Sequence, residues 1–146
     1  MSIILSGCVL IDKDGSLVLL KRRDHGHFET PGGKVEAAEC KNALEPTLDE
    51  LEKTARREVA EEVGEGVKLS RFVYLGKVEF TIPDGRSALA HKFLARIIAG
   101  VPYVKEPNTF LTCEHIPLAH IEQYPLSPDL PMFLPKIREL LSSLLG

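Results

Sequence analysis

The run Arg57-Glu58-Val59-Ala60-Glu61-Glu62-Val63-Gly64 decides the interpretation of this chain, because it combines a regular apolar spacing with three carboxylates. It closes a predicted helix from about Leu48 to Val63. Thr47 and Glu50 have the spacing of a capping box at the start of this helix, and Gly64 is a typical helix-ending residue. The segment from 40 to 47 before it is expected to bulge out as an independent loop.

Apolar and acidic residues of this helix form two adjacent stripes. The predicted core face holds Leu48, Leu51, Ala55, Val59 and Val63, and a carboxylate stripe follows its edge with Glu58, Glu61, Glu62 and Glu65. Like charges four residues apart repel, carboxylates oppose the negative end of the helix dipole, and Glu62 overlaps the core face. A divalent cation would relieve all three penalties, and Mg²⁺ or Mn²⁺ prefers such oxygen ligands. A salt-bridged, solvated helix is the alternative interpretation.

A turn upstream completes a larger pattern. Pro31-Gly32-Gly33-Lys34-Val35-Glu36 and Glu39, followed by the run from Arg57 to Gly64, resembles the Nudix hydrolase box, Gx5Ex7REUxEExGU with U aliphatic. Two departures stand out. Seventeen residues separate Glu39 from Arg57 where the family pattern has seven, which is an insertion of ten. Glu65 occupies the final aliphatic position, and Val67 is expected to supply the missing apolar anchor.

The resemblance implies a role for each matching residue. Glu58, Glu61 and Glu62 would hold Mg²⁺ or Mn²⁺ against a pyrophosphate, with the carbonyl of Gly32 as a backbone ligand. Arg57 would orient a neighbouring glutamate by a charge-assisted hydrogen bond. The segment from 100 to 106 resembles a MutT-type segment that carries a further metal-site glutamate, here Glu106.

The insertion leaves two residues for the first glutamate of the box. Counting forward from Gly33 gives Glu39, and counting back from Arg57 gives Asp49. Asp49 lies nearly three helical turns before Glu61, roughly 18 Å along the axis, so its short side chain cannot reach the site. We therefore expect Glu39 beside the site, as an auxiliary base or a ligand of metal-bound water.

Three residues are predicted to contact substrate: Arg23, Phe28 in the aromatic position before the box, and Asp129. MutT-type relatives place an asparagine that recognises oxidised guanine where this chain has Tyr124-Pro125-Leu126-Ser127-Pro128-Asp129. Asp129 is left as the residue able to bind a base edge.

Other polar and aromatic residues leave alternatives open. His25 and His27 are more typical of a substrate-side loop than of a zinc site, because a third protein ligand is lacking. Either His91 or Lys92 is expected to face the substrate cleft. For Phe28, Phe80 and Phe93 a place in the core is favoured over stacking on a base.

Strand-like and helical segments alternate along one domain, residues 1–146. Strands are predicted at 3–11, 16–22, 67–82 with a break at Gly76, 88–98 and near Phe110, and a closing helix from about Met132. This order predicts an α+β fold, an α/β/α sandwich with a mixed sheet between helices, as in Nudix domains.

Composition excludes several classes of protein. The chain has 146 residues, 44% hydrophobic and 27% charged, and no apolar stretch of the roughly 18 residues that span a bilayer. A net charge of −3 argues against binding to nucleic-acid polymers. Three cysteines without metal spacing suggest a reducing, cytoplasmic compartment. A monomer or homodimer is expected.

The expected function is hydrolysis of a nucleoside diphosphate linked to another group X, a small-molecule nucleotide substrate. A nucleoside triphosphate pyrophosphohydrolase that releases a nucleoside monophosphate and pyrophosphate is preferred. ADP-ribose is the second choice, because Pro83 lies near the proline typical of that subgroup, and dinucleoside polyphosphates are the third. The alternative of another class is a Nudix-fold nucleotide-binding module that has lost catalysis.

Overall fold

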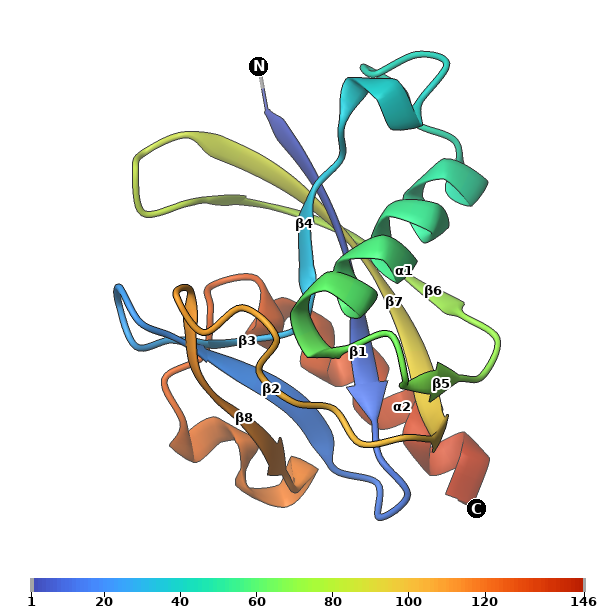
Figure 1. The fold of residues 1–146 in the computed structure, drawn as a ribbon, viewed down its shortest axis with the longest axis vertical. Coiled ribbons are helices and arrows are strands. Elements are labelled where there is room, and N and C mark those ends of the chain that lie inside the picture. Colours follow the sequence, from blue (N-terminus) through green and yellow to red (C-terminus); the bar gives the residue numbers. More distant parts are fainter. Residues whose placement is uncertain (1, 146) are drawn as a thin grey trace.

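A mixed eight-stranded sheet lies between two helices in the computed structural model, which describes residues 2–145 (Figure 1). The predicted α/β/α sandwich is confirmed. The strands are β1 (Ile3–Ile11), β2 (Leu17–Arg22), β3 (Phe28–Glu29), β4 (Gly32–Lys34), β5 (Lys68–Leu69), β6 (Val73–Thr81), β7 (Ser87–Ala99) and β8 (Phe110–Ile116). The helices are α1 (Leu48–Val63) and α2 (Leu130–Leu145), with short 3-10 turns η1 (Ala37–Glu39) and η2 (Leu118–Gln123).

The centre of the sheet is a parallel pair of long strands. β1 and β7 pair from Ile3 opposite Ala88 to Ile11 opposite Arg96. β4 lies antiparallel to β1, with Gly32 opposite Gly7. A Cβ on Gly32 would lie 2.8 Å from the Cα of Gly7, so these two strands require glycine for their close approach. This contact places β4 directly beneath the acidic end of α1.

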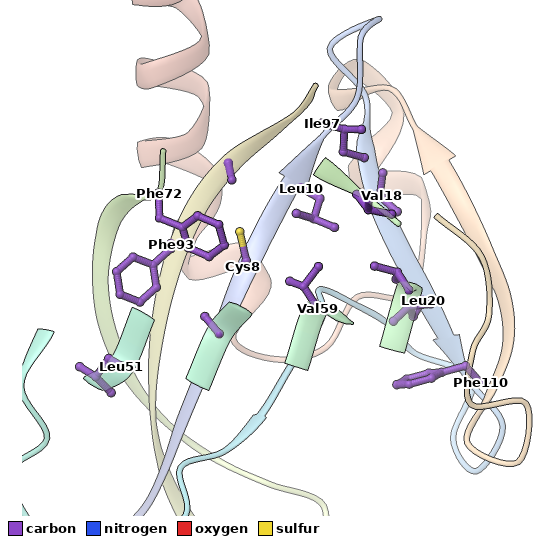
Figure 2. Close-up of a cluster of buried hydrophobic side chains, with 14 of the residues drawn as sticks. Cys8, Leu10, Val18, Leu20, Leu51, Val59, Phe72, Phe93, Ile97 and Phe110 are labelled. Atoms are coloured by element: carbon purple, nitrogen blue, oxygen red, sulfur yellow. The ribbon is translucent and has the colours of Figure 1, made fainter. Parts of the chain in front are cut away.

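Helix α1 begins and ends where the sequence predicts. The Thr47 N–H donates to Glu50 Oε1 at 2.9 Å and the Glu50 N–H to Thr47 Oγ1 at 3.2 Å, which is the predicted capping box. On its buried face, Leu51 and Val59 join a cluster that also includes Cys8, Leu10 and Phe93 of the sheet (Figure 2). Val67 is buried in this cluster and Glu65 is exposed, so the predicted replacement of the apolar anchor is also confirmed.

The prediction that Leu48 belongs to this core is wrong. Leu48 is the first residue of the helix and is 52% exposed, whereas Leu51, one turn later, is the first buried residue of α1. The helical period therefore gives the correct face, and the error concerns only where the helix starts to cover the sheet.

Helix α2 covers the opposite face of the sheet over a second cluster that includes Val9, Leu19, Phe133 and Ile137. It starts two residues before the predicted Met132, at Leu130. Pro131 follows Leu130 and is compatible with a first turn, where no helical N–H partner is needed. None of the helices in residues 2–145 has both the length and the apolar character to span a membrane.

The predicted break at Gly76 is also wrong. The interruption falls between Leu69 and Val73, and Gly76 lies inside β6 at a shift of register against β7, with a φ of 122°. Glycine adopts this backbone conformation readily, so it forms a bulge instead of ending the strand.

Candidate active site

The acidic end of α1 lies against β4. Glu62 is 3% exposed, and its Oε2 accepts a 2.9 Å hydrogen bond from the N–H of Gly32. The Glu58 carboxylate lies so close to Gly33 that any Cβ at that position would overlap it. Glycine at 33 therefore makes room for Glu58, as glycine at 32 makes room for β1.

Arg57 gathers three carboxylates. Its Nε and Nη2 each donate to Glu39 at 2.9 Å, and its Nη1 donates to Glu58 at 2.9 Å and to Glu61 at 3.1 Å. A two-pronged guanidinium–carboxylate pair fixes orientation as well as distance. The structure thus brings together Glu39, Arg57, Glu58 and Glu61, and their individual roles in catalysis stay predictions.

Burial and crowding shape the charge of these acids. Loss of solvent is the main cause that raises the pKa of Glu62 to about 9; the carboxylates of Glu58, Glu29 and Glu106 also raise it, and the hydrogen bond from Gly32 opposes them. Burial likewise raises the pKa of Glu58, although Arg57 opposes this. In contrast, the hydrogen bonds from Arg57 lower the pKa of Glu39 to about 2. The site therefore holds more carboxyl groups than Arg57 can neutralise.

The inserted segment behaves as expected. Between η1 and α1 the chain forms a loop with no helix or strand, which confirms the prediction for 40–47. Glu39 ends η1 beside Arg57, while Asp49 is exposed in the first turn of α1. The use of Glu39 as a base or as a ligand of metal-bound water stays a prediction.

A cavity of about 380 Å³ opens beside Gly32 and Gly33. Its walls come from β1, the end of β2, the β2–β3 loop, β3, β4, β6, the β6–β7 loop, β7 and the residues before α2. In its wall Lys92 Nζ lies 2.9 Å from Asp129 Oδ2, and both side chains are nine-tenths buried. Asp129 therefore lies at the cavity, joined to Lys92, one of the two residues expected to face the substrate cleft, and its contact with substrate stays a prediction.

The other predicted substrate residues lie elsewhere. The guanidinium of Arg23 donates through Nε to the carbonyl of Pro107 at 2.6 Å and is not part of the cavity wall, whereas its neighbour Arg22 is. Phe28 is 4% exposed and packs edge to face on Tyr124, with ring centres 5.3 Å apart. It therefore belongs to the core.

The cavity wall also includes His25, His27, His91, Lys92 and Phe80. Both His91 and Lys92 face it, where one of the two was expected. The assignment of Phe80 to the core is wrong, because this ring is half-buried at the cavity, and the same assignment is confirmed for Phe93, which is 1% exposed.

Sequence reasoning missed Glu29. This carboxylate lines the cavity, its Oε1 lies 3.4 Å from Arg22 Nη1, and burial raises its pKa to about 7 despite that arginine. Strand alternation could have found it: Phe28 faces the core, so the next residue faces the opposite side.

The donor set fits a hard divalent cation. Glu62 is a buried carboxylate with one hydrogen-bond donor and several acidic neighbours, and oxygen ligands suit Mg²⁺ or Mn²⁺. Within residues 2–145 no three acidic, histidine or cysteine side chains are close enough together to form a ready metal cage. Glu58 and Glu61 both accept hydrogen bonds from Arg57, and the carboxyl group of Glu58 also interacts with that of Glu62.

Comparison with solved structures agrees with this geometry. The chain is similar to a MutT NUDIX hydrolase from Burkholderia pseudomallei, with 27% identity, a TM-score of 0.73, and coverage of 92% of this chain and 97% of that one. Two structures with lower sequence identity share the fold. They are the NUDIX domain of Shewanella oneidensis NrtR complexed with ADP ribose (20% identity, TM-score 0.72, coverage 97% and 89%) and a C. elegans Ap4A hydrolase (15%, 0.73, coverage 97% and 98%). No sequence among the curated proteins matches the chain.

These findings define the class of protein as a hydrolase that acts on pyrophosphate bonds. The family model described as the NUDIX domain matches residues 4–136, and the chain therefore belongs to the Nudix family.

Proposed function

We propose that this chain hydrolyses the pyrophosphate of a nucleoside diphosphate linked to X, with a nucleoside triphosphate as the preferred substrate and Mg²⁺ or Mn²⁺ as cofactor. One observation carries the proposal. The carboxylates of Glu58 and Glu62 contact Gly33 and Gly32, and these two glycines also line a cavity of about 380 Å³. A metal-bound pyrophosphate at the acids can thus be continuous with a base and sugar in the cavity, whose volume is typical of ligand pockets.

In this arrangement the residues have distinct tasks. Glu58, Glu61 and Glu62 would hold the cation. The carbonyl of Gly32 would add a backbone ligand, and Glu106 a further carboxylate. The cation would neutralise phosphate oxygens and lower the pKa of bound water. Arg57 fixes the direction of Glu58 and Glu61 through Nη1, and anchors them to Glu39 through Nε and Nη2.

ADP-ribose is a second candidate substrate. Pro83, the residue that resembles the proline typical of ADP-ribose hydrolases, lies in the cavity wall. The NrtR relative was solved with ADP ribose, although its 20% identity supports only the fold.

Release of phosphate and pyrophosphate with Mg²⁺ tests the proposal over a panel of nucleoside triphosphates, ADP-ribose and dinucleoside polyphosphates. We expect a nucleoside triphosphate to give pyrophosphate and the highest kcat/KM. The matched control is Glu62→Gln, which removes the ionisable carboxyl group and retains its volume. Nucleotide binding without hydrolysis of any compound would favour the non-catalytic module.

A further inference from the structure

The segment between β7 and β8 crosses the C-terminal end of α1 (Figure 1). The N–H of Tyr103 donates to the carbonyl of Val63 and the N–H of Lys105 to the carbonyl of Glu62, each across 3.1 Å. The last carbonyls of an α-helix have no partner inside the helix, so these bonds define the path of the segment along α1. Residue 105 is thereby held at the backbone of the most buried acid of the site.

The side chain of Lys105 strengthens the same attachment. Its Nζ lies 3.3 Å from the carbonyl of Ala60 and 3.1 Å from Glu65 Oε1. A cation at the C-terminal end of a helix interacts favourably with the helix dipole. Glu65 is the residue that departs from the family pattern, and in this chain it supplies the partner of Lys105.

Arg23 attaches the segment from the other side. Its Nε donates to the carbonyl of Pro107 at 2.6 Å, and its backbone N–H donates to the carbonyl of Thr109 at 2.9 Å. Arg23 immediately follows β2, so these bonds join the segment to the sheet. Residue 106 therefore lies between one attachment to α1 and one attachment to β2.

Glu106 is the residue that these attachments enclose. It directly follows Lys105, whose N–H is bonded to the carbonyl of Glu62 at 3.1 Å, so the chain places residue 106 at the acidic end of α1. The side chain is exposed, and a turn follows in which the N–H groups of Thr109 and Phe110 donate to the carbonyl of Glu106.

We propose that Lys105 and Arg23 are positioning residues, which hold Glu106 beside Glu62 from opposite sides so that both carboxylates bind the same cation. The inference rests on the proposed function, because it assigns the acids to a divalent metal. It also gives Arg23 a task different from contact with substrate.

Titration of the purified full chain with Mn²⁺ alone, by calorimetry, tests this assignment. Lys105→Met and Arg23→Met should each weaken Mn²⁺ binding roughly 10-fold, the effect typical of residues that orient metal ligands. Lys105→Arg, which keeps the cation, should restore most of the affinity. Lys13→Met and Arg71→Met, at exposed positions outside this segment, should leave the affinity unchanged.

A double variant separates positioning from general destabilisation. Adding Lys105→Met to Glu106→Gln should leave the Mn²⁺ affinity where Glu106→Gln alone sets it, because Lys105 acts through that residue. At saturating Mg²⁺ the KM for the hydrolysed nucleotide should not change in Arg23→Met. If Lys105→Met lowers the melting temperature, Arg23→Met provides the test instead, both as a single variant and combined with Glu106→Gln.

The inference is overturned if the single variants bind Mn²⁺ as the wild type does, or if Lys105→Met weakens binding equally with Glu106 replaced. A rise in nucleotide KM for Arg23→Met, with unchanged Mn²⁺ binding, would return Arg23 to the substrate site. A wild-type chain that binds no Mn²⁺ and hydrolyses no nucleotide would refute the proposed function as well, whereas an active, Mn²⁺-binding wild type with unaffected variants would refute this inference alone.

Discussion

The buried pair of Lys92 and Asp129 makes a strong prediction about stability. Their charged atoms lie 2.9 Å apart and the side chains are 8% and 9% exposed, so removal of one partner leaves the other charge buried without compensation. Such a loss costs about 3–5 kcal/mol. Urea unfolding of Lys92→Met at pH 7 should therefore show a free energy of unfolding lower by about that amount, which corresponds to a melting temperature lower by roughly 10 °C.

The stability of the same variant should depend on pH, in a direction that follows from the pKa of Asp129. Burial favours a higher pKa for Asp129, but Lys92 and Ser127 outweigh it and place the pKa below its ordinary 3.8. In the wild type the contribution of this carboxylate is thus present above pH 3.8 and declines as the pH falls through the lowered pKa. In Lys92→Met the opposing charge is gone and only hydrogen bonds, such as that from Ser127, still act against burial. We therefore expect the folded pKa of Asp129 to lie above the unfolded one, and the variant to recover stability as the pH falls from 7 toward 4.

Two further variants test the same explanation. Lys92→Met combined with Asp129→Leu should recover most of the loss, because no buried charge remains. Lys77→Met, at an exposed position of the neighbouring strand β6, is the matched control and should change stability little. A cost below about 1 kcal/mol for Lys92→Met, with a deficit independent of pH, would refute the reasoning.

Three predictions concern the acids. Glu58→Gln and Glu62→Gln should each lower kcat by at least roughly 100-fold with an unchanged circular dichroism spectrum, because each removes charge at the metal position; near wild-type kcat at saturating Mg²⁺ would contradict this. Millimolar Mn²⁺ or Mg²⁺ should raise the melting temperature of chelator-treated protein, since the cation binds the folded state. Glu39→Gln should lower single-turnover rates by weakening its bond to Arg57, whereas Asp49→Asn should change only stability, by ~1 kcal/mol or less, and the opposite ranking would contradict the assignment.

Features that depend on neighbouring residues could be predicted from the sequence. Thr47 and Glu50 form their capping box within one turn, and the helical period places Glu62 at the edge of the buried face. The loop at 40–47 follows from the same local logic, because Pro46 precedes the N-cap and Glu39 stays joined to the Gly33 turn.

Features that depend on strand register could not be predicted in the same way. Arg22 and Arg23 are adjacent and chemically equivalent, yet Arg22 lines the cavity and Arg23 binds the carbonyl of Pro107. The difference arises from where β2 ends and which segment passes beside it, and both are tertiary properties. The assignment of Phe80 to the core is wrong for a related reason: an aromatic side chain suits either a core or a cavity wall, and the tertiary structure decides between them.

The pair of Lys92 and Asp129 shows how such a tertiary property determines chemistry. Lys92 is on the central strand β7 and Asp129 directly precedes α2, so only the packing of α2 across the sheet brings them together. Without Lys92, the cavity would hold the carboxylates of Asp24, Glu29, Asp84 and Asp129 against the single arginine at 22. Because Lys92 is salt-bridged to Asp129, the pair is electrically neutral and still offers an acceptor and donors to a ligand. Glu29 shares Arg22 with Asp24 and also acts on Glu62, so the proposed cation at Glu62 would stabilise its ionised form.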